Sequence, residues 1–413
     1  MNELVAHAFR HDAARLVAVL TRHAGVRHLA EVEDAVQSAL ESAVTSWAAN
    51  GVPSDRAAWL FRVARNHLLS ALRKSERAPP LEPDERGDEP TATFDDELRD
   101  EQLRMIVVCC DDRLPADSRL VLALKTLCAF STAEIAARLF LTEANVHKRL
   151  QRARDQISRQ GCWGDRLRAD DFETSTPPLE TVRERLPSVR AVLALLFNEG
   201  HLSTHASQAI RVELCDEAIR LATLLAQHRV GAEPETCALL AVMHLHAARL
   251  PARQDASGGL LLLEEQDRST WDEHHLRAGA QWLERAGQGE RLTRFHVEAA
   301  IAAHHCFAPS FAQTPWLEIA ELYAVLEQLD PSPLHTLNRA VALAEARGAE
   351  AGLEVLRPVV PAAWLEGHWL WAAVLADLHR RAGRAEDFAR HRELALSGAP
   401  SDVVRAALSR RLG

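Results

Sequence analysis

The sequence predicts an all-α protein, and three observations lead to that prediction. The 413 residues include only one Tyr and 11 Phe, so aromatic residues that favour strands are scarce, and Gly, which weakens helices, occurs 18 times. Ala, Leu, Arg and Glu, which favour helices, are abundant. Apolar residues recur at spacings of three and four, as on the buried face of a helix. A chain of this length is expected to divide into two to four domains.

A first helical domain is expected over residues 1–78. Its apolar residues fall at helical spacing before and after a break at residues 50–55, Asn-Gly-Val-Pro-Ser-Asp, which predicts a turn that ends in a helix N-cap before Ala57. The helix after this turn carries a basic face, and the turn itself has room for an unstacked base, as in proteins that bind single strands. The residues of this face are Arg62, Arg65, Asn66, Arg73 and Lys74.

Residues 79–97 are rich in Pro, Asp and Glu and predict a flexible acidic linker. Acidic residues concentrated at 82–101 lower the net charge to -10 without affecting the basic stretches at 62–77 and 148–159. Because phosphate binding depends on locally gathered Lys and Arg, the net charge does not exclude a nucleic-acid-binding protein.

A second domain is expected over residues 98–160, and Ser131–Leu150 has the pattern of a helix-turn-helix. Ile135 is expected to pack against Val146, as Leu139 is against Leu150, and Thr142 is placed to cap the second helix. The exposed face of that helix offers side chains that bind base edges or phosphates. These are Asn145, Lys148, Arg149, Arg152 and Arg154. Taken alone, the segment also fits an ordinary basic amphipathic helix.

A linker is expected at 161–185, followed by a helical-repeat domain at 186–413. Residues 333–358 and 366–396 each read as a helix, a Gly-containing turn at Gly348 or Gly383, and a second helix. Each unit has roughly the size of a tetratricopeptide repeat, in which helix pairs stack to share a hydrophobic core.

These features together resemble the extracytoplasmic-function sigma factors of bacterial RNA polymerase. Residues 33–40, Glu-Asp-Ala-Val-Gln-Ser-Ala-Leu, resemble the polymerase-binding helix of domain 2. The resemblance rests equally on the Trp-Leu-x-x-Val-Ala-Arg-Asn run at 59–66 and on the helix-turn-helix, which resembles domain 4. Beyond residue 180, the motifs at 195–200, 214–221, 262–272 and 337–342 are similar to the subgroup with a C-terminal helical extension. The departures are Ser70 in place of an acidic residue, Asp111-Asp112 in place of His-Pro, and residues 291–293 in place of Gly-Pro-Tyr.

The resemblance implies core RNA polymerase and promoter DNA as partners, with no cofactor, no metal and no membrane. Asp34, Gln37 and Glu41 would dock on the clamp helices of the largest polymerase subunit. The 50–55 loop, His67 and the basic face of domain 2 would capture the non-template strand of the -10 element, and the helix-turn-helix would bind the -35 duplex. The acidic linker would run toward the RNA exit path.

In the C-terminal domain, one acidic and aromatic cluster stands out, and three interpretations of it remain open: a ligand pocket, a surface for a protein partner, or a salt-bridge network that holds helices in register. The cluster consists of Glu264, Glu265, Asp267, Arg268, Trp271 and Asp272. Since the resembling subgroup is thought to lack a membrane anti-sigma partner, the extension is expected to control activity itself, by activation or inhibition.

Two other protein classes compete with a sigma factor. An enzyme would draw on the same cluster and on His244, His246, His304 and His305, but His244 and His246 are two residues apart and point to different faces of a helix. A helix-turn-helix regulator or scaffold that does not serve polymerase would have no reason to contain residues 33–74. We therefore expect neither.

The seven cysteines form no C-x-x-C pair, which predicts reduced and mostly buried thiols. The N-terminus Met-Asn-Glu-Leu lacks the regions of a signal peptide, and no run of 18 apolar residues occurs. A cytoplasmic location is expected.

Overall fold

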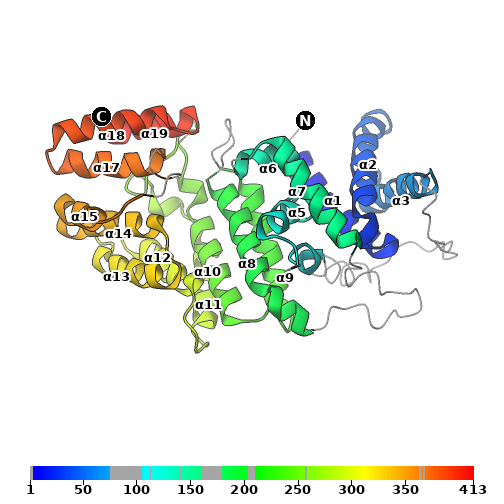
Figure 1. Ribbon diagram of the computed structural model, residues 1–413, viewed down its shortest axis with the longest axis horizontal. Coiled ribbons are helices and arrows are strands. Elements are labelled where there is room, and N and C mark those ends of the chain that lie inside the picture. The colour runs from blue at the N-terminus through cyan, green and yellow to red at the C-terminus, as the bar shows by residue number, and fades with distance from the viewer. Residues whose placement is uncertain are drawn as a thin grey trace. The chain divides into compact units, whose positions relative to one another are not determined.

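The structure is a computed structural model, in which residues 3–74, 105–111, 113–139, 141–159, 179–202, 210–255, 258–361, 365 and 368–413 are described. Within these ranges, all regular secondary structure is helical apart from an isolated bridge between Gln254 and Leu260 (Figure 1). The all-α prediction is confirmed. The chain forms two compact units, Met1–Leu196 and Phe197–Gly413. The expected linker at 79–97 and the start of the one at 161–185 lie outside the described residues.

The first unit begins with three helices, α1 (Glu3–Ala24), α2 (Leu29–Asn50) and α3 (Arg56–Lys74). Leu20, Val32 and Leu60 are among the apolar side chains that these helices bury. The predicted break follows α2, where Gly51 adopts a φ of 80° that favours glycine. The predicted N-cap is confirmed, because the Asp55 carboxylate accepts a hydrogen bond of 2.9 Å from the Ala58 N–H.

The helix-turn-helix is formed by α6 (Thr132–Arg138) and α7 (Glu143–Arg159), preceded by α5 (Ala116–Cys128). Ser131 and Glu134 form a capping box at the start of α6. Thr142 accepts a hydrogen bond of 3.3 Å from the Asn145 N–H, which confirms the predicted cap of α7. Ile135 and Val146 are fully buried, as the pattern of apolar residues predicts. The long helix α8 (Leu179–His201) follows.

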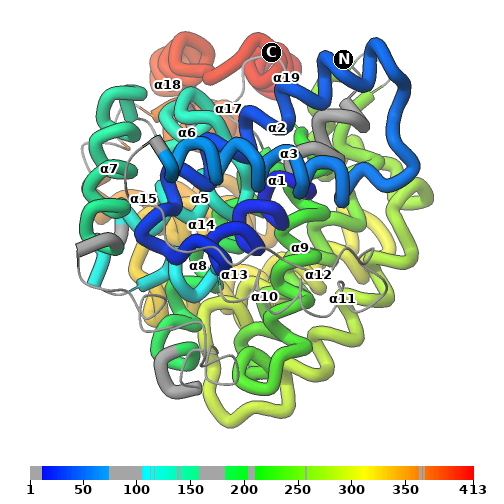
Figure 2. Tube along the Cα trace, turned by 90° about the vertical axis from the view of Figure 1, so that its right-hand side faces the viewer, coloured from blue at the N-terminus to red at the C-terminus, as the bar shows by residue number. Residues whose placement is uncertain are grey.

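The second unit is a succession of helices. They are α9 (Val212–Gln227), α10 (Pro234–Ala247), α11 (Glu273–Ala286), α12 (Arg294–Phe307), α13 (Trp316–Leu329), α14 (Pro333–Arg347), α15 (Ala349–Leu356), α17 (Trp369–Arg381), α18 (Ala385–Ser397) and α19 (Asp402–Leu412), with the short 3-10 helices η3 (Leu250–Ala252) and η4 (Arg268–Thr270). A long connection over residues 248–272 lies between α10 and α11. Neighbours in this succession, such as α17 and α18, lie side by side, as Figure 2 shows from another direction.

Both predicted helix pairs are present in this unit. Gly348, with φ 95°, joins α14 to α15, and Gly383, with φ 73°, joins α17 to α18. At Gly352 a Cβ atom would lie 2.6 Å from the carbonyl oxygen of Ala340, so the close approach of α14 and α15 requires glycine. Leu337, Trp371 and Leu378 belong to one buried apolar cluster that connects the two pairs. Stacked pairs therefore share a core, as the repeat interpretation requires.

Six cysteines lie in the described residues, and all are free and buried, in agreement with the expectation. Cys162 lies outside these residues. No helix of the described chain has the length and apolar character needed to cross a membrane.

Candidate polymerase and nucleic-acid interfaces

One face of α2 presents polar side chains to solvent. Asp34, Gln37 and Glu41 are exposed, whereas Val36 and Ala39 on the opposite side are buried. The Gln37 amide donates a hydrogen bond of 3.2 Å to the Glu41 carboxylate one turn further on. The three side chains predicted to bind polymerase therefore lie together on an open, acidic surface.

Glu33, next to Asp34 in sequence, points the other way and is buried. Its carboxylate accepts a hydrogen bond of 2.7 Å from the Thr126 hydroxyl of α5. The same carboxylate forms an ion pair with Arg154 of α7. A helix of the expected domain 2 is thereby tied to two helices of the expected domain 4.

The basic face predicted on α3 is on the solvent side of the helix. Arg62, Asn66, His67 and Arg73 are exposed and Arg65 is half-buried, while the apolar side chains of the helix, Leu60, Leu68 and Leu72 among them, are buried. The Lys74 side chain lies outside the described residues. At the start of α3, Trp59 packs edge-on against Trp47 of α2 with ring centroids 5.5 Å apart. This contact helps to fix α3, and so its basic face, against α2.

The five residues predicted to bind the -35 element divide into two groups on α7. Asn145, Lys148 and Arg152 are exposed on its outer face. Arg149 is half-buried and forms an ion pair of 3.2 Å with Asp117, and Arg154 is occupied by Glu33. The structure thus leaves three of these side chains open and pairs the other two with carboxylates.

Sequence reasoning missed the role of Asp111. Its buried carboxylate pairs with Arg113 and, at 2.8 Å, with Arg185 of α8. Burial opposes ionisation of this group, but the hydrogen bonds from Arg113 and the charge of Arg185 prevail and lower the pKa to about 2. Arg185 lies far along the chain, and no local pattern indicates the pairing.

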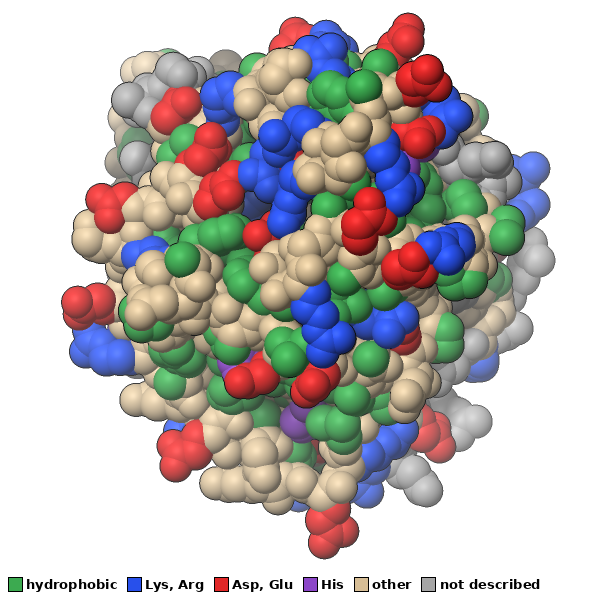
Figure 3. Space-filling model, turned by 90° about the vertical axis from the view of Figure 1, so that its left-hand side faces the viewer, with side chains coloured by type: hydrophobic (Ala, Val, Ile, Leu, Met, Phe, Trp, Pro, Cys, Tyr) green, Lys and Arg blue, Asp and Glu red, His purple; other side chains and the backbone are tan. Residues whose placement is uncertain are grey.

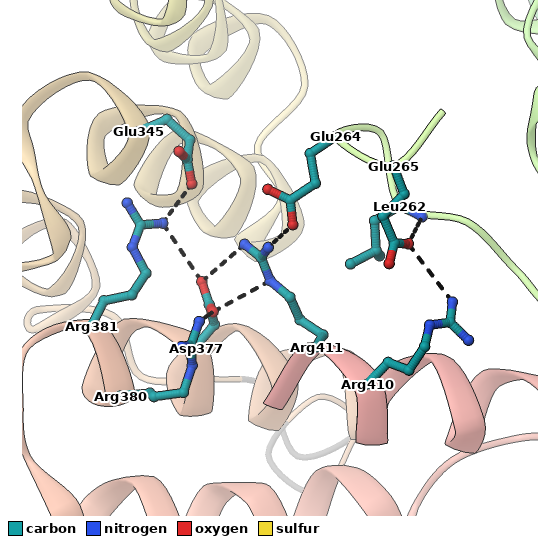
Figure 4. A network of polar contacts seen from close by, with 9 residues as sticks. All are labelled: Leu262, Glu264, Glu265, Glu345, Asp377, Arg380, Arg381, Arg410 and Arg411. Carbon is teal, nitrogen blue, oxygen red and sulfur yellow. Dashed lines mark hydrogen bonds and ion pairs between the residues drawn. The ribbon is translucent and has the colours of Figure 1, made fainter. Parts of the chain in front are cut away.

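The C-terminal cluster of six residues does not form a single site. Glu264 pairs with Arg411, and Glu265 lies 3.7 Å from Arg410, both on α19. Figure 4 shows how Arg411 continues to Asp377 of α17 at 3.4 Å, and how Asp377 and Glu345 bind Arg381. This part of the cluster is a salt-bridge network that connects the segment before η4 with α14, α17 and α19.

The two aspartates of the cluster cap helices. Asp267 accepts a hydrogen bond of 2.9 Å from the Ser269 N–H at the start of η4. Asp272 accepts bonds of 2.8 and 3.0 Å from the N–H groups of His274 and His275 at the start of α11. These local hydrogen bonds account for both carboxylates.

Arg268 and Trp271, the remaining members, turn inward. One nitrogen of Arg268 donates to the carbonyl oxygens of His305 and Ala308 at 2.8 and 2.9 Å. Its guanidinium lies 4.5 Å from the centre of the Trp271 ring, a distance at which a cation is attracted to the ring face.

Of the histidines considered for an enzyme, His244 and His246 have different neighbours. His244 meets His275, with 2.9 Å between their Nδ1 atoms, whereas the His246 ring lies 5.0 Å from that of His201. The expectation that His244 and His246 point to different neighbours is confirmed. Across the described ranges, no group of three or more His, Cys, Asp or Glu side chains is arranged to hold a metal ion.

The side of the second unit turned to the viewer in Figure 3 carries basic and acidic side chains interspersed with apolar ones. Neither sign of charge forms a continuous stripe on that face.

Comparison with known proteins identifies three family matches along the chain. The chain matches the family models "Sigma-70 region 2" over residues 8–78 and "Sigma-70, region 4" over residues 104–157. Residues 185–287 match a family of unknown function, DUF6596. An uncharacterized protein of Rhizobium meliloti (strain 1021), R00370, is 35% identical over 367 residues, which cover 87% of this chain and 84% of that protein. No solved structure matches.

The polar face of α2 and the basic face of α3 lie within the region 2 match, and the helix-turn-helix lies within the region 4 match. The chain therefore belongs to the sigma factors of RNA polymerase, which direct transcription initiation by binding core polymerase and promoter DNA, and it carries a helical C-terminal extension.

Proposed function

We propose that the protein is a sigma factor of the extracytoplasmic-function type whose activity is controlled by its C-terminal helical domain. The observation that carries the proposal is that α2, α3 and α7 each bury their apolar face and leave a polar face of the expected charge open. Domain 2 would span residues 1–78 and domain 4 residues 98–160, with linkers at 79–97 and 161–185 and the regulatory domain at 186–413.

In this proposal Asp34, Gln37 and Glu41 bind basic groups on the polymerase clamp. Their exposure and their position on successive turns of one helix support that role. The -10 strand would be held by Arg62, Arg65, Asn66, His67, Arg73 and Lys74, together with the 50–55 loop. Cations on one helix face provide phosphate contacts, and the loop provides a place for an extruded base.

The -35 duplex would be bound by Asn145, Lys148, Arg149, Arg152 and Arg154. Asn145, Lys148 and Arg152 are exposed and would be accessible to DNA in the observed arrangement. Arg149 and Arg154 would have to exchange Asp117 and Glu33 for DNA, so their contribution to binding is offset by the loss of those ion pairs. Because the polymerase performs catalysis, the protein needs no cofactor or catalytic activity of its own, and we place it in the cytoplasm with the polymerase.

Run-off transcription with purified core polymerase on a promoter library tests the sigma assignment. The full chain should initiate from a paired -35 and -10 motif, and replacing Asp34, Gln37 and Glu41 together by Ala should abolish binding to core polymerase. A helix-turn-helix regulator would instead bind DNA without initiating transcription, and the triple replacement would change nothing.

Lys148→Ala tests the -35 role within the full chain. Loss of one base contact is expected to reduce binding to the matched -35 site by an amount on the order of 1–3 kcal/mol, with a smaller loss on scrambled DNA. Equal losses on the two DNAs would limit Lys148 to phosphate contact.

Control by the C-terminal domain is tested with a chain that ends at Leu196, the end of the first compact unit, so that Arg185 of α8 keeps its pair with Asp111. Binding of this shorter chain to core polymerase shows that its two domains are intact, and its rate of initiation is then compared with that of the full chain. A rise or a fall would identify inhibition or activation by the extension, and identical rates would contradict the regulatory role.

A further inference from the structure

A group of basic side chains gathers inside the second unit, away from the surfaces discussed above. His201 ends α8, His246 lies in the last turn of α10, and Arg249 and Arg253 flank η3. Arg268 belongs to η4 and His305 to the last turn of α12. Four separate segments therefore contribute cations or imidazoles to one place, and we refer to these six residues as the basic cluster.

Short contacts connect the members of the basic cluster. Arg253 contacts the Nδ1 atom of His201 at 2.6 Å, and the His201 and His246 rings are 5.0 Å apart. The guanidinium groups of Arg249 and Arg268 lie 5.7 and 4.5 Å from the centre of the Trp271 ring. Two arginines therefore approach the same Trp271 ring.

Negative charge is missing from this arrangement. In the described parts of the chain, no carboxylate forms an ion pair with Arg249, Arg253 or Arg268; Arg249 has only the Gln266 amide oxygen, at 3.3 Å. Burial and the charge of Arg249 lower the pKa of Arg253 to about 10. Burial and the neighbouring arginines also lower the pKa of His246 to about 3 and that of His305 to about 4. Arg249, Arg253 and Arg268 are half-buried. A partly desolvated cation without a counter-ion is unfavourable, which makes the cluster unusual as a purely structural device.

Several hydrogen-bonding atoms in and beside the cluster have no partner within the described residues. They are one terminal nitrogen of Arg268, Nε1 of Trp271, and Nδ1 of His246 and of His305, all buried. Trp271 is only 5% exposed. Arginine and tryptophan nitrogens are donors only, so acceptor atoms are what this place lacks.

A cavity of about 300 Å³ adjoins the cluster at His305, which forms part of its wall. Aromatic side chains, Phe311, Trp316 and Tyr323, line it together with Leu263 and Asn338. Its lining also includes Glu264, Glu345 and Arg411 of the network in Figure 4, where the charges are already paired. The cavity has the size and the largely apolar lining of a small-molecule site.

We propose that the basic cluster and this cavity bind a small organic anion, with its carboxylate or phosphate group at the arginines and its apolar body among the aromatic side chains. Guanidinium groups bind both kinds of oxyanion through paired hydrogen bonds. An oxyanion supplies the missing negative charge and the missing acceptors at the same time. The cavity volume and the burial of the cluster favour a small molecule over a macromolecular surface.

The test compares the full chain with Arg249→Met, a change that removes the charge but keeps a long apolar side chain. Arg357→Met is the matched control, because Arg357 is exposed and pairs with Glu354 outside the cluster. Thermal unfolding and calorimetric titration are measured with inorganic phosphate and with phenylacetate, against sodium chloride at equal ionic strength. Phosphate also stabilises proteins non-specifically. This effect should be the same in both variants, so the difference between them reports specific binding.

At an anion concentration tenfold above Kd, the Tm of the wild type and of Arg357→Met should rise by about 3 °C or more. Arg249→Met should show no such rise, and its Tm without anion should equal or exceed that of the wild type, because a half-buried cation without a carboxylate partner has been removed. A response to phosphate alone indicates a phosphoryl ligand, one to phenylacetate alone a carboxylate ligand, and one to both a shared anion site.

Two results would overturn the proposal. One is the absence of a saturable response to either anion in the wild type. The other is an Arg249→Met protein that is less stable than the wild type and still responds to the anions, which would make Arg249 a structural residue. Since binding is the readout, neither result depends on whether the protein initiates transcription.

Discussion

Two groups of partly or fully buried arginines, one in each unit, differ in how their charge is balanced. In the first unit Arg154 pairs with Glu33 and Arg185 with Asp111, so each of these two guanidinium groups has a carboxylate. In the second unit Arg249 and Arg253 lie among histidines and another arginine, with no carboxylate paired to them in the described residues. Burial alone does not assign a role to an arginine. The counter-ion indicates the role of the arginine. Where the described chain provides no carboxylate, a bound ligand is the natural source of the negative charge.

The largest loss of stability is expected when Asp111 is replaced. Among the described residues, Asp111→Ala leaves the buried Arg185 with the backbone carbonyl of Val107 as its remaining partner, and should cost about 3 kcal/mol of the free energy of unfolding. Urea denaturation of the full chain measures the loss. Asp117→Ala is the control, because its side chain is 71% exposed and its pair with Arg149 should contribute less than about 1 kcal/mol. Equal losses in the two variants would remove the distinction between buried and exposed pairs.

The Glu33 and Arg154 pair should show an intermediate effect. A double-mutant cycle with Glu33→Gln and Arg154→Gln is expected to give a coupling energy of about 1–2 kcal/mol, since Arg154 retains some exposure. The same cycle at Asp117 and Arg149, measured by the same denaturation, should give about 0.5 kcal/mol or less. Additive single changes at Glu33 and Arg154 would show that the observed pair contributes nothing in solution.

The low pKa of Asp111 predicts a dependence of stability on acidity. A carboxylate whose pKa is lowered on folding stabilises the folded state above its unfolded pKa, and this contribution is lost as the pH falls through the folded value. For Asp111 that window runs from about pH 4 to about pH 2. Acid unfolding curves of the wild type and Asp111→Asn should therefore converge over this range. Parallel curves would contradict the assignment of the low pKa to Asp111.

The smallest loss of stability is expected for the helix cap at Ser131. Ser131→Ala removes the capping box of α6 and should destabilise the protein by about 1 kcal/mol, as measured by chemical denaturation. Ser397→Ala serves as the control, since the Ser397 hydroxyl makes one exposed bond to the carbonyl of Leu394 at the end of α18. A loss at Ser131 no larger than at Ser397 would mean that the cap is replaced by water.

Local features of the fold could be predicted from the sequence because their physical causes are local. The caps at Asp55 and Thr142 and the turns at Gly348 and Gly383 each depend on a few consecutive residues. The exposure of Asp34, Gln37 and Glu41 follows from helical periodicity in the same way.

Long-range pairings could not be predicted. Glu33 lies 121 residues from Arg154, and Glu264 lies 147 residues from Arg411. Residues 264–272 look like one cluster in the sequence, but the turn and the 3-10 helix that contain them point successive side chains in different directions. Their carboxylates therefore serve the α19 network and two helix caps, while Arg268 and Trp271 adjoin the basic cluster.

The contacts of Glu33 have a consequence for energetic communication within the first unit. They join the helix that carries Asp34, Gln37 and Glu41 to the helix that carries Lys148 and Arg152. A ligand whose binding separates α2 from α7 must disrupt the ion pair between Glu33 and Arg154. A second ligand that also requires this separation then binds without the free-energy cost of breaking the pair. Thermodynamic linkage makes such an effect reciprocal: whatever factor the first ligand applies to the affinity of the second, the second applies to the first.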